Sequence, residues 1–219
     1  MSTMPRFFIV AGPNGAGKST LGQAFVPPSI SIFNGDLVFA ELCAQHPDIT
    51  PERLKGGVAV ALERARDQAL EQRKDFAFET NFSSILVVDL IHLFRFHRYR
   101  IDLLYFGLPD LATAVSRVEI RTALGGHDIP NETIQFNLSE GIKMINQNLR
   151  FFDNASFIST SNTPQIIAHY TGLDKKLTII NGEVEWFNNH FKTPLTEMIK
   201  EEERENRIQK PNKKRGRRI

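Results

Sequence analysis

A glycine-rich stretch close to the N-terminus limits the folds that are open to this chain. It fits the pattern G-x-x-x-x-G-K-[ST], which forms a phosphate-binding loop when a strand precedes it and a helix follows it. Both neighbours are predicted here, because residues 7–11 form an apolar, strand-like run and a helix-compatible segment begins at the lysine. The stretch consists of Gly12, Pro13, Asn14, Gly15, Ala16, Gly17, Lys18, Ser19 and Thr20.

Each residue type in this loop has a separate role in phosphate binding. Glycines let successive backbone N–H groups turn inward around a phosphate, and the following helix adds the positive end of its dipole. Lys18 is expected to reach the β- and γ-phosphates, and the Ser19 hydroxyl is expected to bind Mg²⁺. The loop therefore predicts ATP and Mg²⁺ as cofactors. The alternative, a glycine-rich turn with a chance lysine, is disfavoured by the flanking strand and helix.

Composition narrows the class of protein without indicating a function. The chain has 219 residues, of which 41% are hydrophobic and 24% charged, as is ordinary for a globular protein with a substantial core. Cys43 is the only cysteine, which excludes an intramolecular disulfide framework and a multi-cysteine metal site. The N-terminal apolar run is a buried strand in this interpretation and not a signal peptide, and we expect a cytoplasmic protein with no membrane partner.

The net charge of +2 is unevenly distributed along the chain. Seven of the 27 basic residues and no acidic residue lie from Arg207 onward, which leaves 20 basic against 25 acidic side chains in residues 1–206. We expect the tail, residues 207–219, to be solvated and disordered, because a short basic run with proline and glycine lacks the means to fold alone. Nucleic-acid binding by this tail is the weaker alternative.

Strand-like and helix-like segments alternate along most of the chain, which predicts an α/β fold. We expect a P-loop NTPase fold, a doubly wound and mostly parallel sheet with helices on both faces. Asp102 would lie at the starting end of its strand, away from the ligand crevice, as a surface charge. The predicted strands after the loop are 30–33, 76–80, 101–106 and 157–160, and the predicted helices are 37–45, 51–74, 83–96, one from 110, and 132–152.

The C-terminal third predicts a small appendage to this core. We expect a short helix from Thr163 to Tyr170, and then a β-hairpin over 177–187 that turns on Asn181-Gly182, a strong hairpin signal. A polar helix follows over 194–207. The predicted organisation is a kinase-like core over 1–174 with a helical lid around 110–150, the hairpin and helix over 175–206, and the basic tail over 207–219.

Polar residues after the predicted strands indicate which chemistry the loop serves. Ligands bind at the carboxyl ends of parallel strands, where Asp36 and Glu79 are expected. Transport and motor ATPases often carry an acid at the end of a long apolar strand, but the strand over 101–106 ends in Gly107. Phosphoryl transfer to a hydroxyl needs positive charge and a carboxylate that receives the proton. Asp36 suits the role of the base, and Arg117 with Arg121, which share a helix face, suit the charge.

More limited roles remain open for the same residues. Asp36 could orient Mg²⁺ through water or cap the following helix, Glu79 could stabilise only its own loop, and the arginine pair could be surface decoration.

The order of these pieces resembles the zeta-toxin family of P-loop kinases, over residues 6 to about 170. The Phe-Glu-Thr and Gly-Gly-His-x-x-Pro pieces make the resemblance specific, since many ATPases share the loop. The matching pieces are residues 11–20, Asn34-Gly35-Asp36, Phe76 to Thr80, Leu104-Tyr105-Phe106, and Arg117-x-x-x-Arg121 followed by Gly125-Gly126-His127-x-x-Pro130.

The resemblance implies an ATP-dependent kinase. In the best-known members the acceptor is the sugar 3′-hydroxyl of UDP-N-acetylglucosamine, and a partner antitoxin blocks the nucleotide site. By the same resemblance Asp36 matches the catalytic base, Glu79 and Thr80 match the second-substrate region, and Arg117 and Arg121 fall in the lid.

The chain departs from the family at one place. Similar proteins often have several arginines after the Gly-Gly-His-x-x-Pro turn, whereas residues 134–138 here are Ile-Gln-Phe-Asn-Leu. Either Arg117 or Arg121 grips the transferring phosphate instead, or the chain is an ATP-binding regulatory protein with little turnover. A polynucleotide kinase that uses the basic tail is a further alternative. His127 is expected to be a structural residue of the turn.

Overall fold

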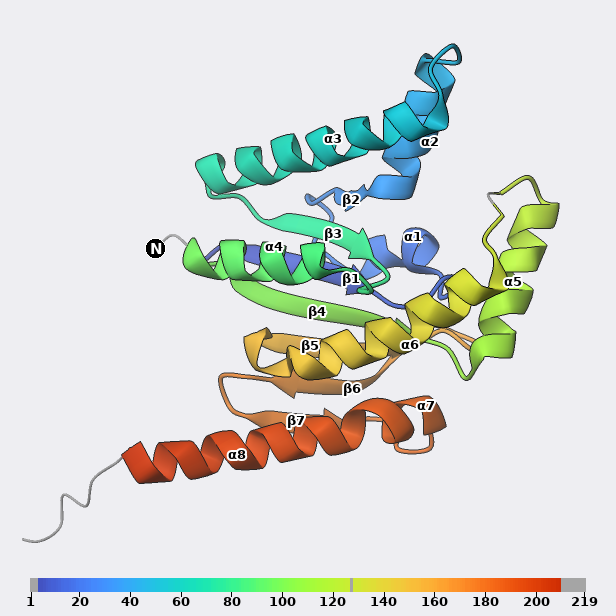
Figure 1. Cartoon of the computed structure of the whole chain (residues 1–219). Helices are drawn as coiled ribbons and strands as arrows, with labels where there is room; N and C mark the ends of the chain where they lie inside the picture. The colour runs from blue at the N-terminus through green and yellow to red at the C-terminus, as the bar shows by residue number, and fades with distance from the viewer. Residues whose placement is uncertain (1–3, 127, 210–219) are drawn as a thin grey trace, which may run out of the picture.

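The computed structural model describes residues 4–126 and 128–209, and in this part of the chain the strands form one seven-stranded sheet (Figure 1). The order across the sheet is β2-β3-β1-β4-β5-β6-β7. The strands are β1 (Arg6–Ala11), β2 (Ile32–Asn34), β3 (Phe76–Thr80), β4 (Arg100–Gly107), β5 (Asn154–Ser159), β6 (Gln165–Thr171) and β7 (Lys176–Ile179).

The first five strands are parallel, and β6 and β7 are antiparallel to their neighbours. Strands that run in one direction end at one edge of the sheet, so Ala11, Asn34, Thr80 and Gly107 lie along the same edge. In Figure 1 the arrowheads of β1 and β3 point toward α1 and α5, at this edge. The predicted mostly parallel, doubly wound sheet is confirmed.

Helices cover both faces of the sheet, as predicted. In the described residues no helix is both long and apolar enough to cross a bilayer. Short turns of other helix types lie at Gly22–Phe25 and Leu149–Phe151 (3-10) and at Asn188–Lys192 (π). The α-helices are α1 (Lys18–Leu21), α2 (Gly35–Gln45), α3 (Pro51–Gln72), α4 (Ile85–Phe96), α5 (Leu111–Ala123), α6 (Asn131–Gln147), α7 (Glu185–Phe187) and α8 (Thr193–Gln209).

The central strand β1 has apolar side chains on both faces, because successive side chains in a strand point to opposite sides. Phe7 and Ile9 belong to a core with α4, the C-terminal half of α6 and α8. Phe8 and Val10 belong to a second core, which includes Ala114 and other residues of α5. A strand that is buried on both faces explains why its sequence is continuously apolar.

Two predictions for the C-terminal third are wrong. Residues 165–171 form β6 and not a helix, because they pair antiparallel with β5. The hairpin turns between β6 and β7, at 172–175, and not at Asn181-Gly182. The backbone N–H groups of Ile180 and Asn181 both donate to the Ile167 carbonyl, so long-range pairing overrides the local turn signal.

Asp102 is a further correction, because it is buried at the start of β4 and is not a surface charge. Its carboxylate accepts hydrogen bonds from Arg6 on β1 and from Asn154 on β5, the strands on either side. A buried carboxylate needs such partners. Helix α6 also ends at Gln147, earlier than the predicted 152.

We expect Gly107→Ala to lower the free energy of unfolding by about 1–3 kcal/mol, because an added Cβ would overlap the indole ring of Trp186. Gly56→Ala, in the second turn of α3, is the matched control, since a Cβ there meets no atom within 4 Å. The control should gain about 0.5–1 kcal/mol. Urea denaturation measures both changes, and equal effects of the two substitutions would contradict this packing.

Candidate active site

A cavity of about 600 Å³ lies at the carboxyl edge of the parallel strands. The phosphate-binding loop, the segments that follow β2 and β3, and one face each of α3 and α5 line this cavity. Sequence segments far apart in the chain therefore meet around one space. Its lining residues are Asn14 to Thr20, Phe33 to Asp36, Lys55, Val58, Ala59, Leu62, Phe78 to Asn81, Leu86, Arg117 and Arg121.

Three glycines give the phosphate-binding loop its shape. Gly12, Gly15 and Gly17 have φ values of 144°, 77° and 81°, which side chains with a Cβ rarely adopt. Gly15 also lies so close to α5 that an added Cβ would be 2.8 Å from the Ala114 carbonyl oxygen. The backbone can therefore follow this path without strain only with glycine at these positions.

Lys18 is buried inside this loop, with 7% of its surface exposed. Its ammonium group donates to the carbonyl oxygens of Gly12 (2.7 Å) and Pro13 (2.9 Å) and to Oδ1 of Asn81 (3.0 Å). Burial lowers the pKa of Lys18 to about 8, and the nearby carboxylates of Glu79 and Asp36 oppose that shift. The lysine is thus held where its charge is costly without an anion beside it.

Glu79 and Ser19 form a polar cluster beside the lysine. The Ser19 hydroxyl donates to Oε1 of Glu79 at 2.7 Å, and Nδ2 of Asn34 donates to Oε2 at 2.8 Å. The predicted metal ligand and the acid at the end of β3 therefore lie in direct contact.

This cluster offers the oxygen ligands that Mg²⁺ prefers, one hydroxyl and one carboxylate, with room in the cavity for water and phosphate oxygens. Among the described residues no group of three or more His, Cys, Asp or Glu side chains could hold a metal ion without a ligand's help. The donor set fits a magnesium ion that arrives with a nucleotide.

Asp36 lies in the first turn of α2 with an exposed side chain that lines the cavity. Oδ1 of Asn34 caps this helix by accepting from the backbone N–H groups of Asp36 (2.9 Å) and Leu37 (3.2 Å). Within the described residues the Asp36 carboxylate accepts no hydrogen bond. The two predicted carboxylates thus differ, since Glu79 is engaged and Asp36 faces open space.

The predicted arginine pair also divides into two environments. Arg117 donates to the carbonyl oxygen of Thr160 at 2.7 Å and to its hydroxyl at 3.2 Å, and it lies 3.5 Å from the Gly15 carbonyl oxygen. Arg117 therefore braces the phosphate-binding loop against the end of β5. Arg121 lines the same cavity and its charge contributes to the lowered pKa of Lys18.

Thr80 uses its hydroxyl oxygen within the protein, because it accepts from the backbone N–H of Phe82 at 2.9 Å. Phe82 has a φ of 61° and is fully buried, so this bond stabilises a left-handed residue two positions after β3. His127, predicted to be structural, lies outside the described residues.

Sequence reasoning missed several residues of the site. Asn34 and Asn81 directly follow the predicted strands 30–33 and 76–80. Their position at the carboxyl ends of these strands, near Asp36 and Thr80, was a signal that could have identified them. Asn137 of α6 and the α3 wall could not have been found this way, because only tertiary packing brings Asn137 to Asn14 and α3 to the cavity.

No known family model and no curated protein sequence matches the chain. Solved structures do match it in fold. One is the AvrRxo1-ORF1:-ORF2 complex with ATP, with a TM-score of 0.65 and 14% identity over 84% of this chain. Only 63% of that AvrRxo1 chain is covered, so this chain spans less than two thirds of its length.

Two further structures support the same fold. A chain of the PezAT chromosomal toxin–antitoxin system of Streptococcus pneumoniae has a TM-score of 0.60 and 14% identity, over 91% of this chain and 85% of that one. A chain of the Pnkp1/Rnl/Hen1 RNA repair complex has a TM-score of 0.55 and 19% identity, over 67% and 47%. The chain therefore shares the fold of these structures, and the P-loop NTPase fold expected from the sequence is confirmed.

The lowered pKa of Lys18 predicts a pH-dependent stability. Above about pH 8 the folded protein loses the Lys18 proton, whereas the unfolded chain keeps it up to about pH 10.5. The unfolded state then binds more protons, so this lysine's unfavourable contribution shrinks as the pH rises from 8 to 10.5. We expect the unfolding free energy of the wild type, relative to Lys18→Met, to rise by about 3 kcal/mol over this range. Urea denaturation measures both unfolding free energies. A difference between wild type and variant that stays constant from pH 8 to 10.5 would contradict a lowered pKa of Lys18.

Proposed function

We propose that this protein is an ATP-dependent phosphotransferase that acts on a hydroxyl group of a small molecule. The observation that carries the proposal is the unequal state of two carboxylates in one cavity. Glu79 is bound to the Ser19 hydroxyl, whereas Asp36 accepts no hydrogen bond from the described residues and faces the cavity. A kinase needs this division, with one acid near the metal and another available to take a proton.

The donor half of the site is the phosphate-binding loop with Lys18, Ser19 and Glu79. When ATP binds, the Lys18 ammonium can exchange its carbonyl partners for phosphate oxygens. The negative charge of the phosphates then offsets the cost of burying the ammonium charge. A magnesium ion bound with ATP would neutralise phosphate charge, and Ser19 and Glu79 are the protein groups that would hold it. This assigns Glu79 to the metal side, in place of the second-substrate role that the resemblance implies.

The acceptor half is the part of the cavity beyond Asp36. Val58, Ala59 and Leu62 of α3 form an apolar wall, and Lys55 lies at one end of it. An acceptor hydroxyl placed between Asp36 and the loop would give its proton to the Asp36 carboxylate while its oxygen takes the γ-phosphoryl group from ATP, which leaves as ADP. Thr80, at the end of β3, lines the same region and is proposed to help position the acceptor.

In this proposal Lys18 and the α5 arginines place positive charge next to the phosphoryl group that is transferred. Arg121 is close enough to affect the charge state of Lys18, and Arg117 holds the loop in shape. The segment around 110–150 was predicted to be a lid. Helix α6 buries one face in the cores, so only the α5 part of this segment is proposed to move as a lid.

The finer assignments rest on the likeness to toxin systems. PezAT is a toxin–antitoxin system and AvrRxo1-ORF1 was solved together with AvrRxo1-ORF2, which supports an antitoxin-like protein partner for this chain. A nucleotide sugar such as UDP-N-acetylglucosamine is the proposed acceptor, and the cytoplasm is the proposed compartment. A polynucleotide kinase is the second candidate, favoured by the likeness to an RNA repair complex and by the basic tail, which lies mostly outside the described residues.

One assay separates these candidates. Wild-type protein with ATP·Mg²⁺ is mixed in turn with nucleotide sugars and with RNA bearing 5′-hydroxyl ends, and the products are analysed by mass spectrometry. A phosphorylated sugar supports the leading proposal, and a phosphorylated RNA end supports the second candidate. Nucleotide binding without any phosphorylated product would favour a regulatory protein.

We expect Asp36→Asn to lower the rate of phosphoryl transfer by about 10²–10⁴-fold, because the base is lost. ATP affinity should change little, since Asp36 lies outside the loop. Steady-state kinetics and calorimetric titration with ATP measure the two effects. Glu41→Gln, an exposed carboxylate on the same helix, is the matched control. An equal loss of binding and transfer in Asp36→Asn would contradict the base assignment.

We expect Glu79→Gln to raise the Mg²⁺ concentration needed for tight ATP binding by about tenfold, because a metal-side carboxylate is removed. Binding of ATP without Mg²⁺ should weaken far less. Titrations with and without the metal measure both quantities. If both bindings weaken equally, Glu79 supports the loop and not the metal.

A further inference from the structure

An asparagine inside the phosphate-binding loop has an unusual environment. Asn14 is 9% exposed, yet it also lines the cavity. Its Oδ1 accepts a hydrogen bond of 2.8 Å from Nδ2 of Asn137 on α6. Two buried amides, more than a hundred residues apart in sequence, therefore connect the loop directly to that helix.

A third residue extends this chain of hydrogen bonds. The Ser83 hydroxyl donates to Oδ1 of Asn137 at 2.6 Å, so the oxygen of Asn137 faces Ser83 and its nitrogen faces Asn14. The Asn14 oxygen faces Asn137 on α6, so its NH₂ group lies on the other side of the same amide. Within the described residues this NH₂ group donates to no protein atom, although the side chain borders the cavity.

The helix that carries Asn137 is held firmly on this side. Ile134 is fully buried, and Gly141 lies so close to Asn81 that an added Cβ would be 2.5 Å from the Asn81 carbonyl oxygen. Asn81 in turn accepts from the Lys18 ammonium group. Helix α6 thus supports the loop at Asn14 and, through Asn81, at the lysine.

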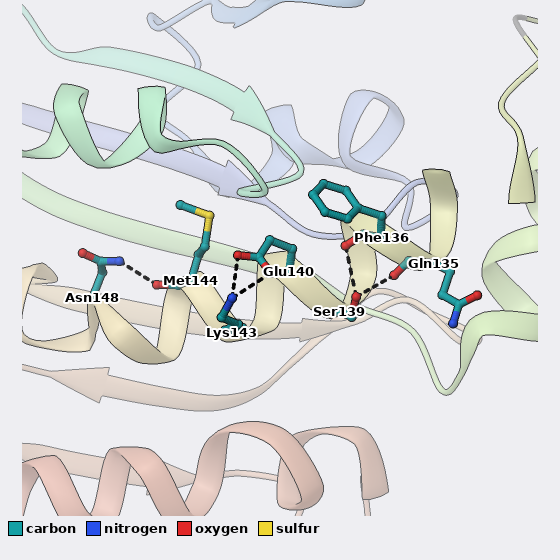
Figure 2. Close-up of polar contacts among 7 residues, drawn as sticks. All are labelled: Gln135, Phe136, Ser139, Glu140, Lys143, Met144 and Asn148. Atoms are coloured by element: carbon teal, nitrogen blue, oxygen red, sulfur yellow. Dashed lines mark hydrogen bonds and ion pairs between the residues drawn. The ribbon is translucent and has the colours of Figure 1, made fainter. Parts of the chain in front are cut away.

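Figure 2 shows other polar side chains of α6, and those of Ser139, Glu140 and Lys143 bond within the helix itself. Ser139 donates to the carbonyl oxygens of Gln135 (3.0 Å) and Phe136 (3.2 Å), and Lys143 pairs with Glu140 at 3.1 Å. These side chains do not contact the loop, so a substitution among them is a control for substitutions of Asn137.

We propose that Asn14 donates a hydrogen bond to the γ-phosphate of the bound nucleotide, and that Asn137 and Ser83 are positioning residues that aim its NH₂ group. The inference rests on the proposed function, since it names the ligand as a nucleoside triphosphate in the same cavity. The Lys18 ammonium lies against the Gly12 and Pro13 carbonyl oxygens, directly before Asn14, and this lysine serves the β- and γ-phosphates. Asn14 therefore directly follows the two loop residues that contact the ammonium group expected to meet the γ-phosphate.

The chemistry suits a buried site that already carries several cations. A hydrogen bond from a neutral donor to a charged acceptor is stronger than a neutral pair, especially away from water. An amide adds this bond without a further positive charge next to Lys18, whose pKa is already lowered by burial. The α6 segment 134–138 has no cation of its own, and in this proposal its contribution to the phosphate is the oriented amide.

The test compares the affinities of a triphosphate and a diphosphate without any acceptor. Isothermal titration calorimetry with Mg²⁺ and either the β,γ-imido analogue of ATP or ADP gives both dissociation constants. Asn14→Ala should weaken the triphosphate about tenfold and leave ADP nearly unchanged. Residual selectivity for the triphosphate would come from Lys18 and the metal.

The positioning residues have a sharper signature. Asn137→Asp places an oxygen where the NH₂ group was, so Asn14 must turn its own NH₂ toward α6 and its oxygen toward the phosphate. Triphosphate affinity should then fall more in Asn137→Asp than in Asn137→Ala, while ADP affinity stays the same. Ser83→Ala should weaken the triphosphate moderately, and Ser139→Ala, on the outer face of α6, should change neither affinity.

The outcomes separate this inference from the proposed function. Equal weakening of triphosphate and diphosphate in Asn14→Ala would overturn the inference, because a merely structural role affects both. A wild type that binds the triphosphate but phosphorylates no acceptor contradicts the kinase proposal alone, and one that binds neither nucleotide overturns both. Thermal melting identifies variants that do not fold. If Asn14→Ala does not fold, Ser83→Ala and Asn14→Asp replace it. The carboxylate introduced by Asn14→Asp should also lower the affinity for the triphosphate and not that for ADP.

Discussion

The buried ammonium group of Lys18 is the interaction on which the site depends. It joins the carbonyl oxygens of Gly12 and Pro13 to the side chain of Asn81, and so connects the phosphate-binding loop to the segment after β3. A charge in this position is costly, as its lowered pKa indicates. The loop is therefore arranged around a cation that lacks an anionic partner in direct contact, and an incoming phosphate would supply one.

Neighbouring elements hold this arrangement from three sides. Helix α5 approaches the loop so closely that only glycine fits at position 15, and Arg117 connects the loop to the end of β5. Helix α6 contacts the loop through Asn137. Glu79 and Asn34 close the remaining side at Ser19. The two carboxylates of the cavity thus acquire different surroundings, which is the basis for assigning them different roles.

Much of the fold was predictable because its signals are local. Continuous apolar strands and the glycine loop identify the parallel part of the sheet. The errors occurred where pairing between distant segments decided the structure. Residues 165–171 joined β5 as a strand, and Asp102 became buried because Arg6 and Asn154 from the neighbouring strands could satisfy its charge.

By itself the sequence determined the phosphate-binding loop, the positions of Asp36 and Glu79 at strand ends, and the α/β class, since each follows from residue types at fixed spacing. Only the tertiary structure decided that Glu79 contacts Ser19 while Asp36 stays open, that α3 forms a wall of the cavity, and that Asn137 reaches Asn14. These relations join residues far apart in the chain. Their distances depend on how helices pack on the sheet, and no local pattern records that packing.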